Sequence, residues 1–83
     1  MTKEQIFTDV QEIICDYMAV FVEEVTYDAN LREDLGMDSL EIIHVVGQIE
    51  EKFDIRIDDD KIFGLNMVGD YVEEIFTQCN NKK

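Results

Sequence analysis

The residues best suited to chemistry in this chain lie together in one segment, Asp34-Leu35-Gly36-Met37-Asp38-Ser39-Leu40-Glu41. A helix-periodic apolar run follows, so Ser39 is expected in the first turn of a helix. There its hydroxyl lies beside unpaired backbone N–H groups and the positive end of the helix dipole, which stabilise a phosphate attached to that oxygen. The segment therefore predicts a serine that is suited to carrying a phosphate group.

Ser39 is not placed to act as a nucleophile of its own. His44, the one histidine of the chain, lies five residues along, about 140° around a helix of 3.6 residues per turn. A nucleophilic serine needs a base within hydrogen-bond reach, and no triad is available. We therefore expect Ser39 to be modified rather than to catalyse, and we expect the chain not to be an enzyme.

A purely structural interpretation of the same segment stands beside the chemical one. Asp38 followed by Glu41 three residues later resembles a capping box, in which Asp38 is the N-cap of the helix. Ser39 would then be an ordinary first-turn residue, and Gly36 a turn glycine. The two interpretations are compatible, because Asp38 can cap a helix that also presents Ser39.

Apolar residues at steps of three and four predict the helices that position this segment. The first helix starts at a capping box formed by Thr2 and Gln5. The stretch 20–25 is expected to be a frayed helix end and the start of a loop. The residues expected to face inward from the first helix are Ile6, Val10, Ile13, Ile14, Tyr17 and Phe21.

A long loop over 26–37, with Leu31 and Leu35 as apolar anchors, leads to a second helix from Asp38 or Ser39 to about Phe53. Its inward residues are expected to be Ile42, Val45, Val46, Ile49 and Phe53. A short helix over about 58–63 follows, ended by Gly64 in the left-handed conformation. The last helix runs over about 67–79 with Asn66 as its cap, and its inward residues are expected to be Val68, Tyr71, Val72, Ile75 and Phe76.

Gly69 is expected to cost that last helix about 1 kcal/mol relative to alanine. With no convincing strand pattern, the predicted fold is an all-α bundle of four helices, three longer and one short. At 83 residues, of which 46% are hydrophobic, the chain is expected to form one domain over 1–83.

Composition limits the partners. Twenty Asp and Glu against seven Lys and Arg give a net charge of −13, which disfavours nucleic acid and anionic membranes and favours partners with basic patches. The longest charge-free runs are far shorter than the roughly 20 residues of a membrane span, so no membrane insertion is expected. Cys15 and Cys79 form no disulfide framework or metal-ligand spacing, and Asp58-Asp59-Asp60 lacks an EF-hand pattern. We expect a cytoplasmic monomer with free thiols and no metal site.

A second line of residues on the helix after Ser39 is expected to be a docking surface. Leu40 and Ile43 should be at least partly exposed beside Glu41, which places apolar and acidic groups together. His44 would make this surface pH-sensitive, and Gly47 would leave a flat spot. The expected partner-binding residues are Leu40, Glu41, Ile43, His44, Gly47 and Glu51.

Segment 34–41 fits the attachment motif D-L-G-x-D-S-L-[DE], and the chain resembles the acyl carrier proteins. Glu24-Val25-Thr26 before the loop, and the run over 49–57, also resemble that family, so the resemblance covers essentially the whole chain. The chain departs from the family at three positions. His44 stands where the family often has an acidic residue, Gly47 where it often has a bulky apolar residue, and Asp58 where proline is frequent. They leave attachment intact and affect the choice of partner and pathway.

The resemblance implies that Ser39 receives 4′-phosphopantetheine from coenzyme A through a phosphopantetheinyl transferase with Mg²⁺. Asp38 and Asp34 match the acidic positions that assist this transfer. The thiol of the arm would carry acyl groups as thioesters between acyl-handling enzymes, with fatty-acid synthesis as the first expectation and a polyketide-type pathway next. Two alternatives remain open, namely a carrier of aminoacyl or peptidyl groups and a cofactor-free acidic helical interaction module.

Overall fold

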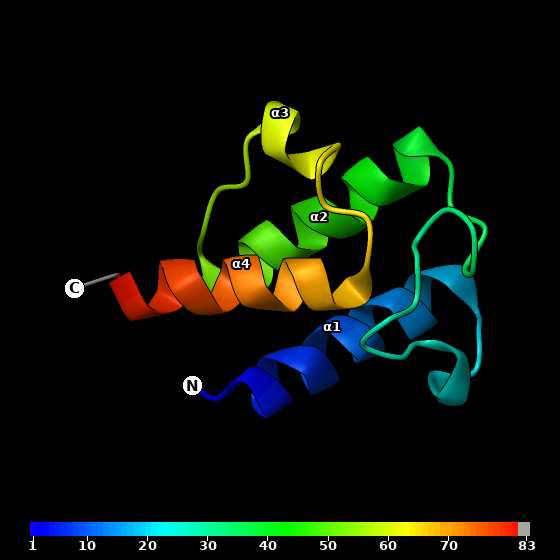
Figure 1. Ribbon diagram of the computed structural model, residues 1–83, viewed down its shortest axis with the longest axis horizontal. Helices are drawn as coiled ribbons and strands as arrows, with labels where there is room; N and C mark the ends of the chain where they lie inside the picture. Colours follow the sequence, from blue (N-terminus) through cyan, green and yellow to red (C-terminus); the bar gives the residue numbers. More distant parts are fainter. Residues whose placement is uncertain (82–83) are drawn as a thin grey trace.

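The computed structural model describes residues 1–81, and the regular elements within that range are helical (Figure 1). An isolated antiparallel bridge joins Asn30 to Met67 without forming a strand. This confirms the all-α prediction. The elements in chain order are α1 (Lys3–Met18), the 3₁₀ helix η1 (Val22–Glu24), α2 (Ser39–Phe53), α3 (Asp59–Ile62) and α4 (Val68–Asn81).

Helix α1 begins at the predicted capping box. The Gln5 backbone N–H donates to Thr2 Oγ1 at 3.1 Å, and the Thr2 N–H donates to Gln5 Oε1 at 3.0 Å. The helix ends earlier than its apolar pattern suggests, because Ala19 adopts the left-handed conformation (φ 56°). The prediction that Phe21 faces inward is therefore wrong, and Phe21 is 76% exposed. The same prediction for Tyr17 is also wrong, since Tyr17 lies within α1 but is 38% exposed.

After the turn at Ala19 the chain forms η1. This short helix lies inside the stretch 20–25, expected to be a frayed helix end and the start of a loop. Gln11 of α1 holds this turn, since its Nε2 donates to the carbonyl oxygens of Val22 at 3.1 Å and Val25 at 2.9 Å. Val25, rather than Phe21, then enters the core. The connection is thus fixed to α1 at both ends of η1.

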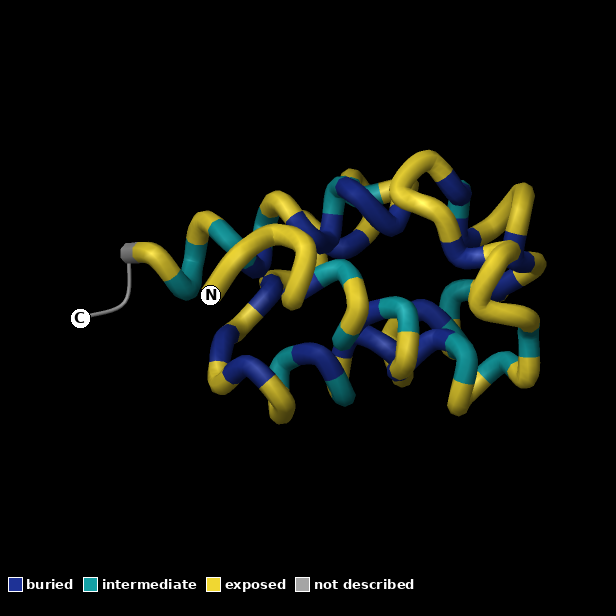
Figure 2. Tube along the Cα trace, turned by 90° about the horizontal axis from the view of Figure 1, so that it is seen from below, coloured by how far each residue is buried: buried dark blue, intermediate teal, exposed yellow. Residues whose placement is uncertain are grey.

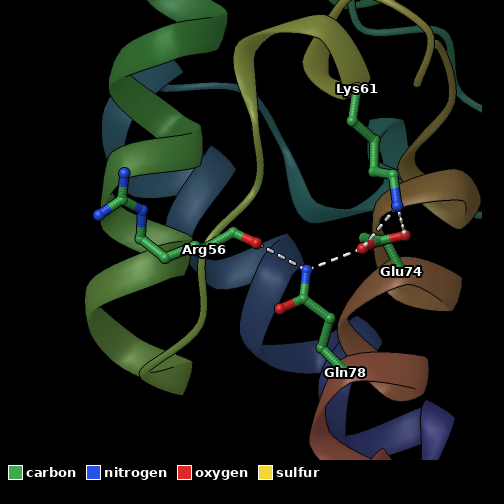
Figure 3. Close-up of polar contacts among 4 residues, drawn as sticks. All are labelled: Arg56, Lys61, Glu74 and Gln78. Carbon is green, nitrogen blue, oxygen red and sulfur yellow. Dashed lines mark hydrogen bonds and ion pairs between the residues drawn. The ribbon is translucent and has the colours of Figure 1, made fainter.

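Helix α3 and the segment before it are attached to α4 by a small polar cluster (Figure 3). Gln78 Nε2 donates to the Arg56 carbonyl and to Glu74 Oε2, both at 2.7 Å, and Lys61 Nζ lies 3.3 Å from Glu74 Oε1. The helix ends in a right-handed turn at Phe63 (φ −77°), closed by a 2.9 Å bond from the Gly64 N–H to the Lys61 carbonyl. The left-handed conformation predicted for Gly64 is therefore wrong, and positive φ among the glycines occurs at Gly36.

Helix α4 is capped by a residue inside its own first turn. The Asp70 carboxylate accepts from the N–H groups of Asn66 at 3.1 Å and Met67 at 3.0 Å, so the capping oxygen comes from Asp70 rather than from Asn66 as predicted. Tyr71 is buried and donates from its hydroxyl to the Ile62 carbonyl at 3.2 Å, which links α4 to α3. Phe76, predicted to face inward, is half-buried beneath Lys3.

One core lies between the helices, and α1 packs against both α2 and α4. Figure 2 shows buried positions facing the interior and exposed positions following the outer sides of the tube. The inward face predicted for α2 is confirmed, and Leu31 and Leu35 of the loop are buried as predicted. The loop before Ser39 is thereby anchored in the same core as the helix that Ser39 begins.

The loop also contacts α4 closely at Gly69. The Gly69 N–H donates to the Tyr27 carbonyl at 2.8 Å, and the Tyr27 ring occupies the space that a Cβ would need. The Tyr27 hydroxyl donates to Glu73, which also forms a 2.9 Å ion pair with Lys3. Loop, α1 and α4 therefore meet at this point.

Candidate functional site

Ser39 is the first residue of α2 and is half-buried at the surface where the loop joins the helix. Its Oγ accepts a hydrogen bond of 2.9 Å from Nη2 of Arg32, a residue of the loop. A guanidinium donates only and cannot remove a proton from the hydroxyl. The structure therefore places beside Ser39 a group that holds the hydroxyl and attracts anions, rather than a base.

The capping box of α2 is present as the structural interpretation predicted. The Glu41 N–H donates to Asp38 Oδ1, and the Asp38 N–H donates to Glu41 Oε1, both at 2.9 Å. The N–H groups of Ser39 and Leu40 also lie in the first turn, where they have no acceptor within the helix. Capping by Asp38 thus coexists with a helix start suited to a phosphate at Ser39.

The loop that presents Ser39 is held by its own hydrogen bonds. The Asn30 N–H donates to Asp34 Oδ2 at 2.7 Å, while Asn30 Oδ1 accepts from the N–H groups of Arg32 and Glu33, both at 2.9 Å. Gly36 has φ 71° and nothing within 4 Å of the position a Cβ would occupy. The carboxylate of Asp34 thus shapes the loop, and the space beside Gly36 is open.

The His44 ring packs against α1, so it is not positioned to act as a base for Ser39. It stacks on Tyr17 of α1 with ring centroids 4.3 Å apart and an interplanar angle of 19°. Tyr17, which the apolar pattern assigned to the core, thus lies at the surface beside the second line of α2. Sequence patterns do not predict this contact, since it depends on how α1 and α2 cross.

The exposure predicted for the second line of α2 is confirmed. Leu40 is 78% exposed and Ile43 is 43% exposed. His44, Gly47 and Glu51 are exposed too, and Glu41 is half-buried. The six residues follow one side of the helix from the turn that begins at Ser39.

An open cleft of about 330 Å³ lies between α2 and the segment that contains α3. Ile43 and Val46 line it from α2, and Ile57 and Ile62 from the other side. Charged groups rim it, including Glu50, whose carboxylate accepts from the Ile57 N–H at 2.7 Å. The cleft begins about one helical turn beyond Ser39.

Arg32 is the site residue that the sequence interpretation missed. A signal was present, since Arg32 is the only Lys or Arg between Lys3 and Lys52. Among the described residues, no group of three or more His, Cys, Asp or Glu side chains is arranged to hold a metal ion. None of the helices within residues 1–81 has the length and apolar character that a membrane crossing requires.

The site thus presents a half-buried serine at a capped helix start, bonded to a guanidinium rather than to a base. The family described as "Phosphopantetheine attachment site" matches residues 8–75. The chain is 47% identical over 78 residues to an acyl carrier protein of Exiguobacterium sibiricum, covering 94% of this chain and 99% of that protein. It is 41% identical over 70 residues to an acyl carrier protein of Sulfurovum sp., covering 84% and 93% respectively.

The fold agrees with these relatives. A solved acyl carrier protein from Enterococcus faecalis superposes with a TM-score of 0.78 at 28% identity, covering 93% of this chain and 98% of that one. The chain therefore belongs to the acyl carrier proteins of the phosphopantetheine-binding family. Its cofactor is 4′-phosphopantetheine, and its role is to carry acyl groups. This resolves the alternatives of an aminoacyl carrier and of a cofactor-free module in favour of the acyl carrier.

Proposed function

We propose that Ser39 is the attachment residue and that the chain is a carrier without catalytic activity of its own, working in fatty-acid synthesis. The observation that carries the proposal is the hydrogen bond from Arg32 to the hydroxyl of Ser39, a half-buried residue at the start of α2. The N–H groups of the first turn and the guanidinium both favour a phosphate at that oxygen. The open space beside Gly36 leaves room for a transferase to approach.

In the loading step, Ser39 Oγ forms a bond to the phosphorus that is linked to pantetheine in coenzyme A. The phosphoanhydride bond breaks, 3′,5′-ADP leaves, and the serine proton passes to a base that the transferase supplies. Asp38 and Asp34 lie on either side of Gly36 and would assist by orienting the Mg²⁺–coenzyme A complex. Both are exposed, although each also accepts a backbone hydrogen bond.

When attached, the arm supplies the thiol that bears the acyl group as a thioester. The chain's own cysteines, Cys15 and Cys79, are both half-buried and pack against the core. Burial, followed by the charge of Asp16, raises the pKa of the Cys15 thiol, and a raised pKa leaves less of the reactive thiolate. We therefore assign the acyl cargo to the arm on Ser39 and no such role to Cys15 or Cys79.

The partners would be a phosphopantetheinyl transferase and acyl-handling enzymes with basic docking patches, met by a monomeric carrier in the cytoplasm. The net charge of −13 supports electrostatic steering toward basic surfaces. The exposed side chains of Leu40 and Ile43 support a short-range apolar contact next to the arm. Glu41, His44, Gly47 and Glu51 would form the rest of this docking surface.

The attachment claim is tested by incubating the wild type and Ser39→Ala with coenzyme A and a broad-specificity transferase. We expect one arm on the wild type and none on Ser39→Ala, by intact mass, with the helical circular dichroism of both preserved. A Ser39→Ala variant that still gains the mass of an arm would show that the site has been assigned to the wrong residue.

The docking claim is tested with Leu40→Ala and Glu41→Lys, and Glu12→Lys on α1 is the matched control for the change in charge. Leu40 is so exposed that its truncation should leave the melting temperature within a few degrees of wild type. We expect loading to slow about threefold to tenfold in both α2 variants, and to change little in the control. Normal loading rates in both folded α2 variants would move recognition off this helix.

A further inference from the structure

We propose that Arg32 is a positioning residue for the phosphate of the arm, holding the Ser39 hydroxyl before loading and pairing with the phosphodiester afterwards. The inference rests on the proposed attachment at Ser39. Its starting observation is the 2.9 Å hydrogen bond from Arg32 Nη2 to Ser39 Oγ. No other Lys or Arg lies between Lys3 and Lys52 in the sequence.

The geometry allows the guanidinium to serve both states. After loading, Ser39 Oγ becomes a bridging oxygen, and the two non-bridging oxygens lie one bond further out. Arginine presents five N–H donors in a planar fork that matches phosphate oxygens. Because Arg32 is exposed, its guanidinium can follow the phosphate outward while its backbone stays in place.

The backbone of Arg32 is fixed before any ligand arrives. Its N–H donates to Asn30 Oδ1 at 2.9 Å, and its carbonyl accepts from the Gly36 N–H at 3.2 Å. The preceding residue, Leu31, is buried and donates from its N–H to the Asn66 carbonyl at 3.0 Å. The side chain therefore starts from a rigid point, so less entropy is lost when it engages a phosphate.

Charge gives Arg32 a task that other residues near Ser39 do not perform. Loading adds one negative charge beside the carboxylates of Asp38 and Glu41, which close the capping box of the same turn. In a chain of net charge −13, that addition is opposed by the surrounding field. A guanidinium at hydrogen-bond distance offsets this repulsion locally, and most strongly at low ionic strength.

The test compares Arg32→Gln and Arg32→Lys with the control Arg56→Gln, which removes the same charge elsewhere. The Arg56 side chain points away from the polar cluster that its carbonyl joins (Figure 3), so its loss leaves that cluster intact. Each full-length protein is loaded from coenzyme A by a transferase, and its mass confirms the arm. The readout is the ³¹P chemical shift of the folded, loaded protein relative to the same protein in urea.

We expect this folded-minus-unfolded difference to shrink by roughly half or more in Arg32→Gln, to be partly kept in Arg32→Lys, and to be unchanged in Arg56→Gln. We also expect the loading rate of Arg32→Gln to fall about threefold to tenfold relative to Arg56→Gln at low salt. If folded Arg32→Gln takes up no arm at all, this is the predicted loss of loading rate in its extreme form. The ³¹P measurement is then made on loaded Arg32→Lys.

A wild-type ³¹P difference and loading rate in Arg32→Gln would overturn the role of Arg32 while leaving the attachment site standing. A wild type that takes no arm at Ser39 would instead overturn the attachment proposal, and the role of Arg32 with it. The mass and the chemical shift thus separate the two failures.

Discussion

Alanine at position 69 would place a methyl group inside the volume of the Tyr27 ring. The added Cβ would lie 2.4 Å from Cδ2 and Cε2 of Tyr27 and 2.9 Å from the Tyr27 carbonyl oxygen. Overpacking of this kind costs about 1–3 kcal/mol. Any shift that relieves it also strains the 2.8 Å hydrogen bond from the Gly69 N–H to that carbonyl.

The preference of a helix for alanine, which is at most about 1 kcal/mol, opposes this penalty. The strained hydrogen bond adds about 0.5–1.5 kcal/mol to the penalty. The net expectation for Gly69→Ala is therefore a loss of about 1–3 kcal/mol in the free energy of unfolding, and each kcal/mol lowers the melting temperature by about 4–8 °C. Gly47 offers the matched control, because it lies inside α2 with nothing within 4 Å of its added Cβ. Gly47→Ala should raise stability by about 0.5–1 kcal/mol.

Thermal and urea denaturation followed by circular dichroism would measure both variants. The same substitution in two helices of one protein should act with opposite signs, which separates packing from helix propensity. Adding Tyr27→Ala should remove most of the penalty of Gly69→Ala, since the ring is then gone. If Gly69→Ala is as stable as wild type or more stable, the ring moves aside freely and the reasoning is refuted.

Two further predictions concern charge. Raising the ionic strength from low to moderate should raise the melting temperature, because salt screens the self-repulsion of a net charge of −13, and a flat response would contradict this. Burial raises the pKa of Tyr71 to about 12, and the hydrogen bond to Glu73 raises the pKa of Tyr27 to about 12. Both shifts favour the neutral phenol in the folded state, so their contribution to stability is full below about pH 10 and is lost as the pH rises toward about 12. Tyr71→Phe should lose less stability than wild type as the pH rises above about 10, measured by urea denaturation at each pH. Equal losses in the two proteins would contradict a raised pKa of Tyr71 as a cause of the alkaline loss.

Local signals predicted most of the fold. The capping pairs Thr2–Gln5 and Asp38–Glu41 follow from sequence spacing alone, because both partners lie within one turn of each other. The end of α1 was missed for a comparable reason. The residue that ends α1 in the left-handed conformation is Ala19. Glycine and asparagine are typical at such a position, whereas alanine does not indicate it.

Contacts between distant segments could not be predicted in the same way. The stacking of His44 on Tyr17 and the approach of Tyr27 to Gly69 depend on the crossing of elements far apart in the chain. At the site, the motif identified Ser39 and its acidic neighbours, whereas the path of the loop alone brings Arg32 onto the hydroxyl. Inserting or deleting one residue in that loop would move the guanidinium away from the Ser39 hydroxyl.

The most direct test of the central claim is fragmentation mass spectrometry of the wild-type protein after loading from coenzyme A. The account predicts a single arm, carried by fragments that contain Ser39 and by no fragment that excludes it. An arm located on another residue, or a folded wild type that gains none under conditions that load a known carrier, would contradict it.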